Sequence, residues 1–119
     1  MATDSLVDEL VVAGADDWVT AAEVAWIAKS MGSATTLHEI KALSVELMHA
    51  VLAAGLMEAG DVTDGGFLAW EVPPEEAVAR IERSWEQLGR LPNIGDVCWL
   101  ANTDAGNRRA HTVTPDLPR

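Results

Sequence analysis

This sequence of 119 residues has a single cysteine, no tyrosine and few basic residues. The lone Cys98 cannot form a disulfide within the chain, which fits a reducing compartment. No apolar run approaches the roughly 20 residues that a membrane-spanning helix needs. The first residues carry no positive charge, so the sequence predicts no secretory signal. We therefore expect a cytoplasmic protein that has no membrane segment.

Positive charge is especially scarce in the first two thirds of the chain. Residues 1–79 hold 14 acidic residues and only Lys29 and Lys41, a formal charge of −12. Residues 80–119 hold six arginines and five acidic residues, a formal charge of +1. Lys and Arg on phosphates supply most of the affinity of a protein for DNA. The composition therefore disfavours nucleic acid and anionic membranes as partners, and it favours a basic protein.

Residue types that perform catalysis or hold metals are few and scattered. Cys98 lies in an apolar segment, where a buried structural thiol is the favoured interpretation. His38 and His49 are three helical turns apart, about 16 Å along a helix, which is too far to share an ion. The third histidine, His111, lies near the C-terminus. We expect no catalytic residue, no metal site and no cofactor, and we predict that the protein is not an enzyme.

Among the residues that are present, helix signals dominate the first half. Leu6–Ala13 predicts a first helix, with Gly14 as its stop. Thr20 and Glu23 form a capping-box pattern for a second helix that ends at Gly32. Thr35 or Thr36 begins a third and longest helix, which reaches about Ala54 and is followed by Gly55.

The second half predicts a hairpin and further helices. Strands are expected at Leu56–Ala59 and Phe67–Val72, around an Asp64-Gly65 turn. A helix is expected from Pro74 to Gly89, because its apolar residues recur at helical spacing. They are Val78, Ile81, Trp85 and Leu88. Short helical turns are expected over Ile94–Leu100 and from Asn102 to Ala110.

The fold class expected from this layout is mainly α with a small two-stranded β-hairpin. Its 49% apolar content and its length fit one folded domain, expected over residues 1–110, with a flexible tail at 111–119.

The arrangement of residues 19–72 resembles a winged helix-turn-helix domain. Val19-Thr20-Ala-Ala-Glu23-Val24 opens the first helix of the pair, and Thr36–Gly55 occupies the recognition-helix position. Leu56-Met57-Glu58 and Phe67-Leu68-Ala69-Trp70 would be the wing strands. The resemblance implies a winged-helix-like three-helix core followed by C-terminal helices. It says little about function, because one fold serves many functions.

The C-terminal third is similar to a group of small acidic bacterial cytosolic proteins. The similarity rests on Arg80-Ile81-Glu-Arg83-Ser-Trp85 and on a Trp, Gly and Asn-Thr pattern over Gly95–Gly106. Some proteins of this group accompany secreted toxins as proposed immunity partners. The resemblance implies a protein partner for this chain.

We expect the acidic region to bind another protein, of basic character. In this interpretation the chain is an immunity or inhibitor protein, and the partner that it masks is a toxin. A merely solvated acidic surface is the plain alternative. The residues expected to contact the partner are Asp16, Asp17, Trp26, Glu58, Asp61 and Asp64. The rival function is a winged-helix DNA-binding regulator, in which arginines of the last third contact phosphates. Those arginines are Arg80, Arg83, Arg108 and Arg109, and a homodimer is compatible with either function.

Overall fold

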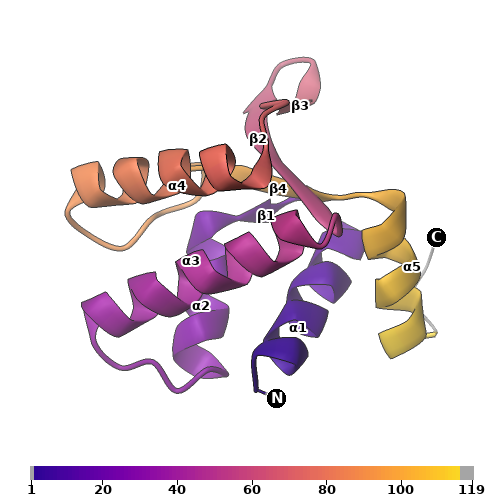
Figure 1. Cartoon of the computed structure of the whole chain (residues 1–119), viewed down its shortest axis with the longest axis horizontal. Helices are drawn as coiled ribbons and strands as arrows, with labels where there is room; N and C mark the ends of the chain where they lie inside the picture. The colour runs from indigo at the N-terminus through magenta and orange to yellow at the C-terminus, as the bar shows by residue number, and fades with distance from the viewer. Residues whose placement is uncertain (1, 116–119) are drawn as a thin grey trace.

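The computed structural model of the chain describes residues 2–115, and helices make up most of them (Figure 1). The elements follow in the order α1 (Ala2–Asp16), β1 (Val19–Thr20), α2 (Ala21–Ser30), α3 (Leu37–Ala53), β2 (Met57–Thr63), β3 (Gly66–Ala69), α4 (Pro74–Leu88), β4 (Trp99–Asn102) and α5 (Asp104–Val113). The protein is thus mainly α, with a small antiparallel sheet.

The sheet is larger than the expected two-stranded hairpin, because it has four strands in the order β1-β4-β2-β3. The strand β4 lies between β1 and β2, with Trp99 opposite both Thr20 and Gly60. The helix expected over Ile94–Leu100 is therefore wrong, since the last residues of that span begin β4. Backbone pairing with strands remote in sequence overrides a weak local preference here.

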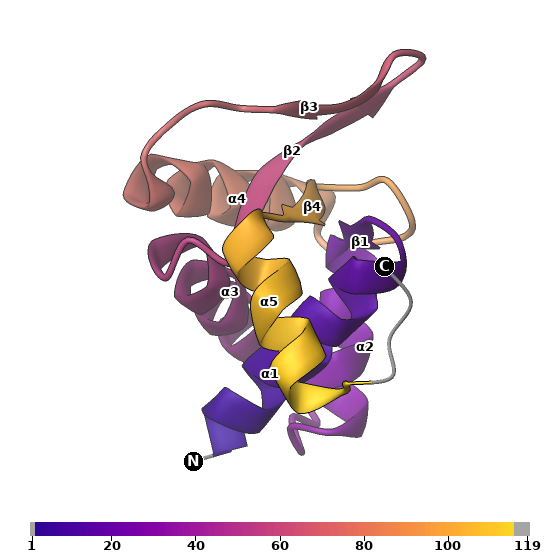
Figure 2. The same ribbon diagram turned by 90° about the vertical axis from the view of Figure 1, so that its right-hand side faces the viewer.

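The hairpin turns at Asp64 and Gly65 as predicted, but β2 extends beyond Ala59 and β3 ends at Ala69 instead of Val72. Strand β2 continues to Thr63, and β3 begins at Gly66 directly opposite it. Only Asp64 and Gly65 connect the two strands. The hairpin projects from the body of the molecule in both views (Figures 1 and 2).

Helix α3 is the centre of the core. It packs against α1, α2, α4 and β2. Its buried residues are Ile40, Ser44, Leu47, Met48, Val51 and Leu52. A reciprocal capping box begins the helix: Thr36 Oγ1 accepts a hydrogen bond from the Glu39 amide, and Glu39 accepts one from the Thr36 amide. The Thr36 and Thr35 amides and the Thr35 hydroxyl all donate to the Glu39 carboxylate and hold its pKa down at about 2.

Helix α2 has only half of the capping box that its sequence predicts. Thr20 Oγ1 accepts from the Glu23 amide at 3.2 Å, as expected. Glu23 makes no return bond to Thr20, which instead lies in β1. Burial and the nearby charge of Asp17 raise the pKa of Glu23.

The two ends of the described chain pack together, since α5 lies along α1 (Figure 2). The Asn102 amide, just before α5, donates to the carbonyl oxygen of Val11 at 2.8 Å. Gly14 lies inside α1 and does not stop it, so the first helix is longer than expected. Helix α5 continues to Val113, into the segment expected to be a tail; the last four residues, 116–119, lie outside the described residues.

Candidate functional site

The outer face of the sheet is defined by the strand register. Met57, Ala59 and Leu100 point to the helices and are buried. Side chains alternate along a strand, so the neighbouring positions point to the opposite face. That outer face includes Glu58, Gly60, Val62, Phe67 and Trp99.

Trp18 joins this outer face from the segment between α1 and β1. Its ring centroid lies 6.3 Å from that of Phe67, with the planes tilted by 33°. Such a tilted pair is a favourable aromatic arrangement. The Phe67 ring lies over Gly60, where even a methyl group would come within 2.8 Å of it. Trp18 nevertheless keeps 40% of its surface exposed.

Acidic residues lie on both sides of the Trp18–Phe67 contact. Asp16 and Asp17 directly precede Trp18, and the Asp17 carboxylate accepts a 2.7 Å hydrogen bond from the Trp18 amide. Asp64 is at the hairpin turn, three residues before Phe67. All three carboxylates are exposed. The contact therefore brings the segment with Asp16 and Asp17 to the hairpin that carries Asp64.

Asp61 has a different environment from the one expected. It lies within β2, opposite Leu68, and its side chain is on the face away from Phe67. The Trp70 indole N–H donates to its Oδ2 at 3.1 Å, and Arg80 Nη2 is 3.8 Å from the same oxygen. The Arg80 guanidinium also lies 3.9 Å from the centroid of the Trp70 ring. Asp61 thus joins the hairpin to α4 and is not a free carboxylate of the turn.

The remaining candidates lie apart. Glu58 is exposed on the outer face near the base of the hairpin, beside a cavity of about 290 Å³ that Glu71 and Thr103 also line. Trp26 is 57% exposed, but it is on α2, which packs mainly against α3, α1 and β1. Asp16 and Asp17 thus precede Trp18, Glu58 and Asp64 belong to the hairpin, and Trp26 lies on α2 one helical turn after Glu23, whose pKa is raised by burial and by the charge of Asp17.

The solvent-facing side of α3 is acidic. After the exposed first residues Leu37 and His38, its exposed positions recur at helical spacing and are Glu39, Ala42, Glu46, His49 and Ala53. Lys41 is partly buried and forms an ion pair with Glu86 of α4. That hydrogen bond and charge lower the pKa of Glu86. Lys41, the one lysine or arginine of α3, is thus engaged within the protein.

The arginines of the last third do not form one strip. Arg80 and Arg83 are on α4, whereas Arg108 and Arg109 are on α5, and these helices lie on opposite sides of the fold (Figure 1). Arg80 contacts Asp61, and Arg109 Nε donates to Asp8 Oδ1 at 2.8 Å. Two of the four are therefore engaged within the protein.

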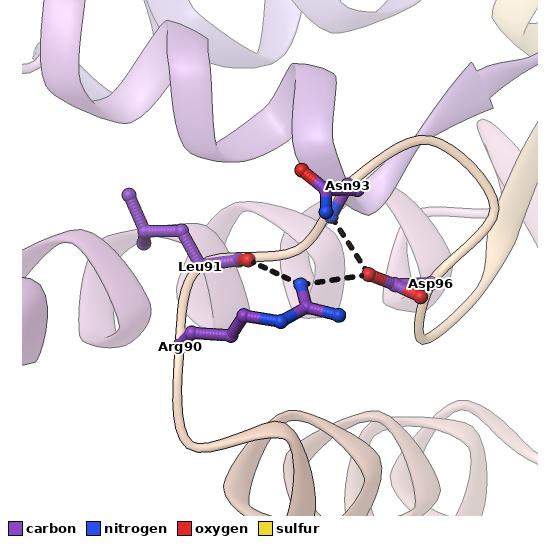
Figure 3. A network of polar contacts seen from close by, with 4 residues as sticks. All are labelled: Arg90, Leu91, Asn93 and Asp96. Carbon is purple, nitrogen blue, oxygen red and sulfur yellow. Dashed lines mark hydrogen bonds and ion pairs between the residues drawn. The ribbon is translucent and has the colours of Figure 1, made fainter.

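A polar network organises the loop between α4 and β4 (Figure 3). Asp96 Oδ2 accepts from the Asn93 amide at 2.9 Å and from Arg90 Nη1 at 3.0 Å. The same Arg90 nitrogen donates to the Leu91 carbonyl oxygen at 2.9 Å. The Asn93 amide and then Arg90 lower the pKa of Asp96. These bonds stay within the loop, so the network shapes the approach to β4.

Cys98 lies at the end of this loop and is buried. Burial, with a smaller effect of the Asp61 charge, raises the pKa of its thiol to about 12. Its Sγ is 3.9 Å from Met48 Sδ. Within residues 2–115 no three histidine, cysteine or carboxylate side chains gather to hold a metal ion. The part of the chain that the structure describes also has no helix that could cross a membrane.

Comparison of the chain with protein-family models, with curated proteins and with solved structures gives no significant match. The winged-helix and immunity-protein resemblances therefore stay predictions.

Sequence reasoning missed the aromatic side chains of the outer face. Trp18, Phe67 and Trp99 come from three separate segments, and only the pairing of β4 with β1 and β2 unites them. One local signal was available, since Trp18 directly follows two aspartates and precedes a helix cap. The predicted exposure of Trp26 is confirmed, since 57% of its surface is exposed.

Proposed function

We propose that the protein is a small acidic protein-binding module whose partner is a basic protein. Its most concrete form is a cytoplasmic immunity or inhibitor protein that masks a basic surface of a toxin. In this proposal a winged-helix-like fold presents the protein-binding surface and does not bind DNA. The Trp18–Phe67 contact carries the proposal. It holds the exposed Trp18, which directly follows Asp16 and Asp17, against the hairpin that carries Asp64.

The chemistry of this surface suits protein recognition. Tryptophan is enriched among the residues that dominate binding energy, since it buries a large area at low entropic cost. Carboxylates at the rim steer a partner of opposite charge and accelerate association. Residues 2–17 contain no lysine or arginine, and Asp16 and Asp17 add negative charge directly before Trp18.

We propose no DNA-binding function. Recognition by a winged helix needs cations on its third helix and wing to replace counterions on phosphates. The exposed side of α3 carries Glu39 and Glu46, and the hairpin carries Asp61 and Asp64. A fluorescence-anisotropy titration with duplex DNA at two salt concentrations checks this: we expect no binding near physiological salt.

The direct test is to isolate the partner by pull-down from the native host and to measure both rate constants. We expect an association rate that falls as salt rises, because screening weakens electrostatic steering. Neutralising Asp16, Asp17 and Asp64 to asparagine should slow association, and Trp18→Ala should speed dissociation. Asp61 is left unchanged, since its removal would also disturb Trp70 and Arg80.

Trp26→Ala is the matched control, because it removes an exposed tryptophan that is not part of the Trp18–Phe67 contact. It should leave both rates unchanged. Rates that ignore salt, the triple variant and Trp18→Ala would show that the acidity is only a solvated surface, and the proposal would fail.

A further inference from the structure

The outer edge of β3 is an open sheet edge. Strand β3 is last in the order β1-β4-β2-β3, and no other described element lies beyond it in either view (Figures 1 and 2). An open edge presents backbone N–H and C=O groups that another strand can pair with.

The register identifies which groups point outward. The Trp70 amide donates to the Ala59 carbonyl oxygen at 3.0 Å, so these two residues form a hydrogen-bonded pair. Such pairs alternate along antiparallel strands, which makes Leu68 with Asp61 the next one. The backbone groups of Phe67 and Ala69 therefore point away from β2. Neither residue makes another hydrogen bond within the described part of the chain.

Apart from its short length, this edge lacks the usual protection against pairing. Natural edges carry lysine, proline or a bulge. Strand β3 reads Gly66-Phe67-Leu68-Ala69, with none of these, and Leu68 is 62% exposed. The strand is short, so Phe67 and Ala69 supply one donor and one acceptor each. Side-chain contacts must add to these bonds.

Charge defines the occupant. Residues 60–79, which contain β3, hold five acidic residues and no basic one. They are Asp61, Asp64, Glu71, Glu75 and Glu76. The nearest cation, Arg80, is already engaged by Asp61 and the Trp70 ring. A second copy of this chain is a poor occupant, because each copy carries a formal charge of −11.

We propose that the β3 edge binds an extended, positively charged segment of the partner by strand addition. This inference rests on the proposed function, because it takes the basic partner from there and adds the mode of contact. Main-chain bonds to Phe67 and Ala69 give the register, and the flanking carboxylates select basic side chains.

The test uses a fluorescent short peptide that alternates arginine and valine. Ala69→Pro removes an outward N–H that the fold does not use, and proline is tolerated at such edge positions. Ala69→Ser is the matched control, because it keeps the N–H. A fully N-methylated version of the peptide keeps its charge but has no N–H donors. It tests the edge with the unaltered protein, whatever the stability of the proline variant.

We expect Ala69→Pro and peptide methylation each to weaken binding by about tenfold or more, and Ala69→Ser to leave it unchanged. Binding that ignores both changes would overturn strand addition while leaving the basic-partner proposal standing. An uncharged threonine-valine peptide is used for comparison. If it binds as tightly as the arginine peptide and Ala69→Pro weakens it equally, strand addition at the edge stands and the preference for a basic partner is overturned. No binding of the arginine peptide to the wild type would overturn strand addition, whereas the pull-down and rate measurements decide the basic-partner proposal separately. A dimer that Ala69→Pro converts to a monomer would assign the edge to a second copy and overturn this inference.

Discussion

Trp85 is the side chain on which the docking of α4 depends most. It is 4% exposed and lies between Ile81 and Leu88 on the apolar side of α4, which packs mainly against α3. Trp85→Ala deletes the indole and leaves a hole beneath the helix. Replacing a large buried aromatic residue by alanine costs about 3–5 kcal/mol.

The structure places the cost toward the lower end of that range. A cavity of about 200 Å³ already lies beside Trp85, lined also by Leu37 and Leu91. Neighbouring side chains and water can move into the space that the indole leaves, which reduces the cavity penalty. We expect the free energy of unfolding to fall by about 3 kcal/mol, a large share of the roughly 5–15 kcal/mol that is typical of a folded domain. The melting temperature should fall by about 10 °C.

The assay is urea and thermal unfolding followed by circular dichroism, with Trp26→Ala as the control. The control makes the same substitution at a tryptophan that is 57% exposed, and it should change stability by less than about 0.5 kcal/mol. If Trp85→Ala melts within about two degrees of the wild type, α4 does not dock through this face and the reasoning is wrong.

Three further outcomes follow from the core and the helix caps. Ser44→Ala should stabilise the protein by about 1 kcal/mol in urea unfolding, because the Ser44 hydroxyl is fully buried and has no hydrogen-bond partner in the described structure; a loss of stability would reveal a partner. The folded pKa of Glu39 is about 2, below its ordinary 4.5, so its stabilising effect is present above pH 4.5 and is lost as the pH falls toward 2. The stability difference between wild type and Glu39→Gln should therefore be largest near neutral pH and should shrink with acid; a constant difference would contradict this. Cys98, buried and with its pKa raised to about 12, should react with a thiol reagent at neutral pH only when the protein unfolds, and equal rates in buffer and in denaturant would refute its burial.

Local signals in the sequence predicted the helix boundaries that depend on a single turn of chain. Pro74 begins α4, where its missing N–H costs nothing. Gly55 and Gly89 follow the ends of α3 and α4 with φ angles of 71° and 67°, a conformation that glycine adopts without strain. The apolar spacing around Trp85 also predicted which face of α4 is buried. In each case the deciding interactions lie within a few residues.

Predictions failed where a distant segment supplied the deciding contact. Trp99–Asn102 is a strand because its backbone pairs with β1 on one side and with β2 on the other. Strand β2 lies about 40 residues earlier in the sequence. Gly14 lies inside α1, where Asn102 and Met57 from later strands pack closely against it. Asp61 was expected to be a free acid of a turn, but Arg80 comes from the next helix to contact it.

The sequence by itself determined the charge of the candidate surface, because charge depends only on composition. It also determined the order of the helices before the last third, because capping and periodicity are local. Only the tertiary structure brought Trp18 against Phe67 and left the β3 edge open, because both result from pairing and packing between segments that composition and periodicity do not link.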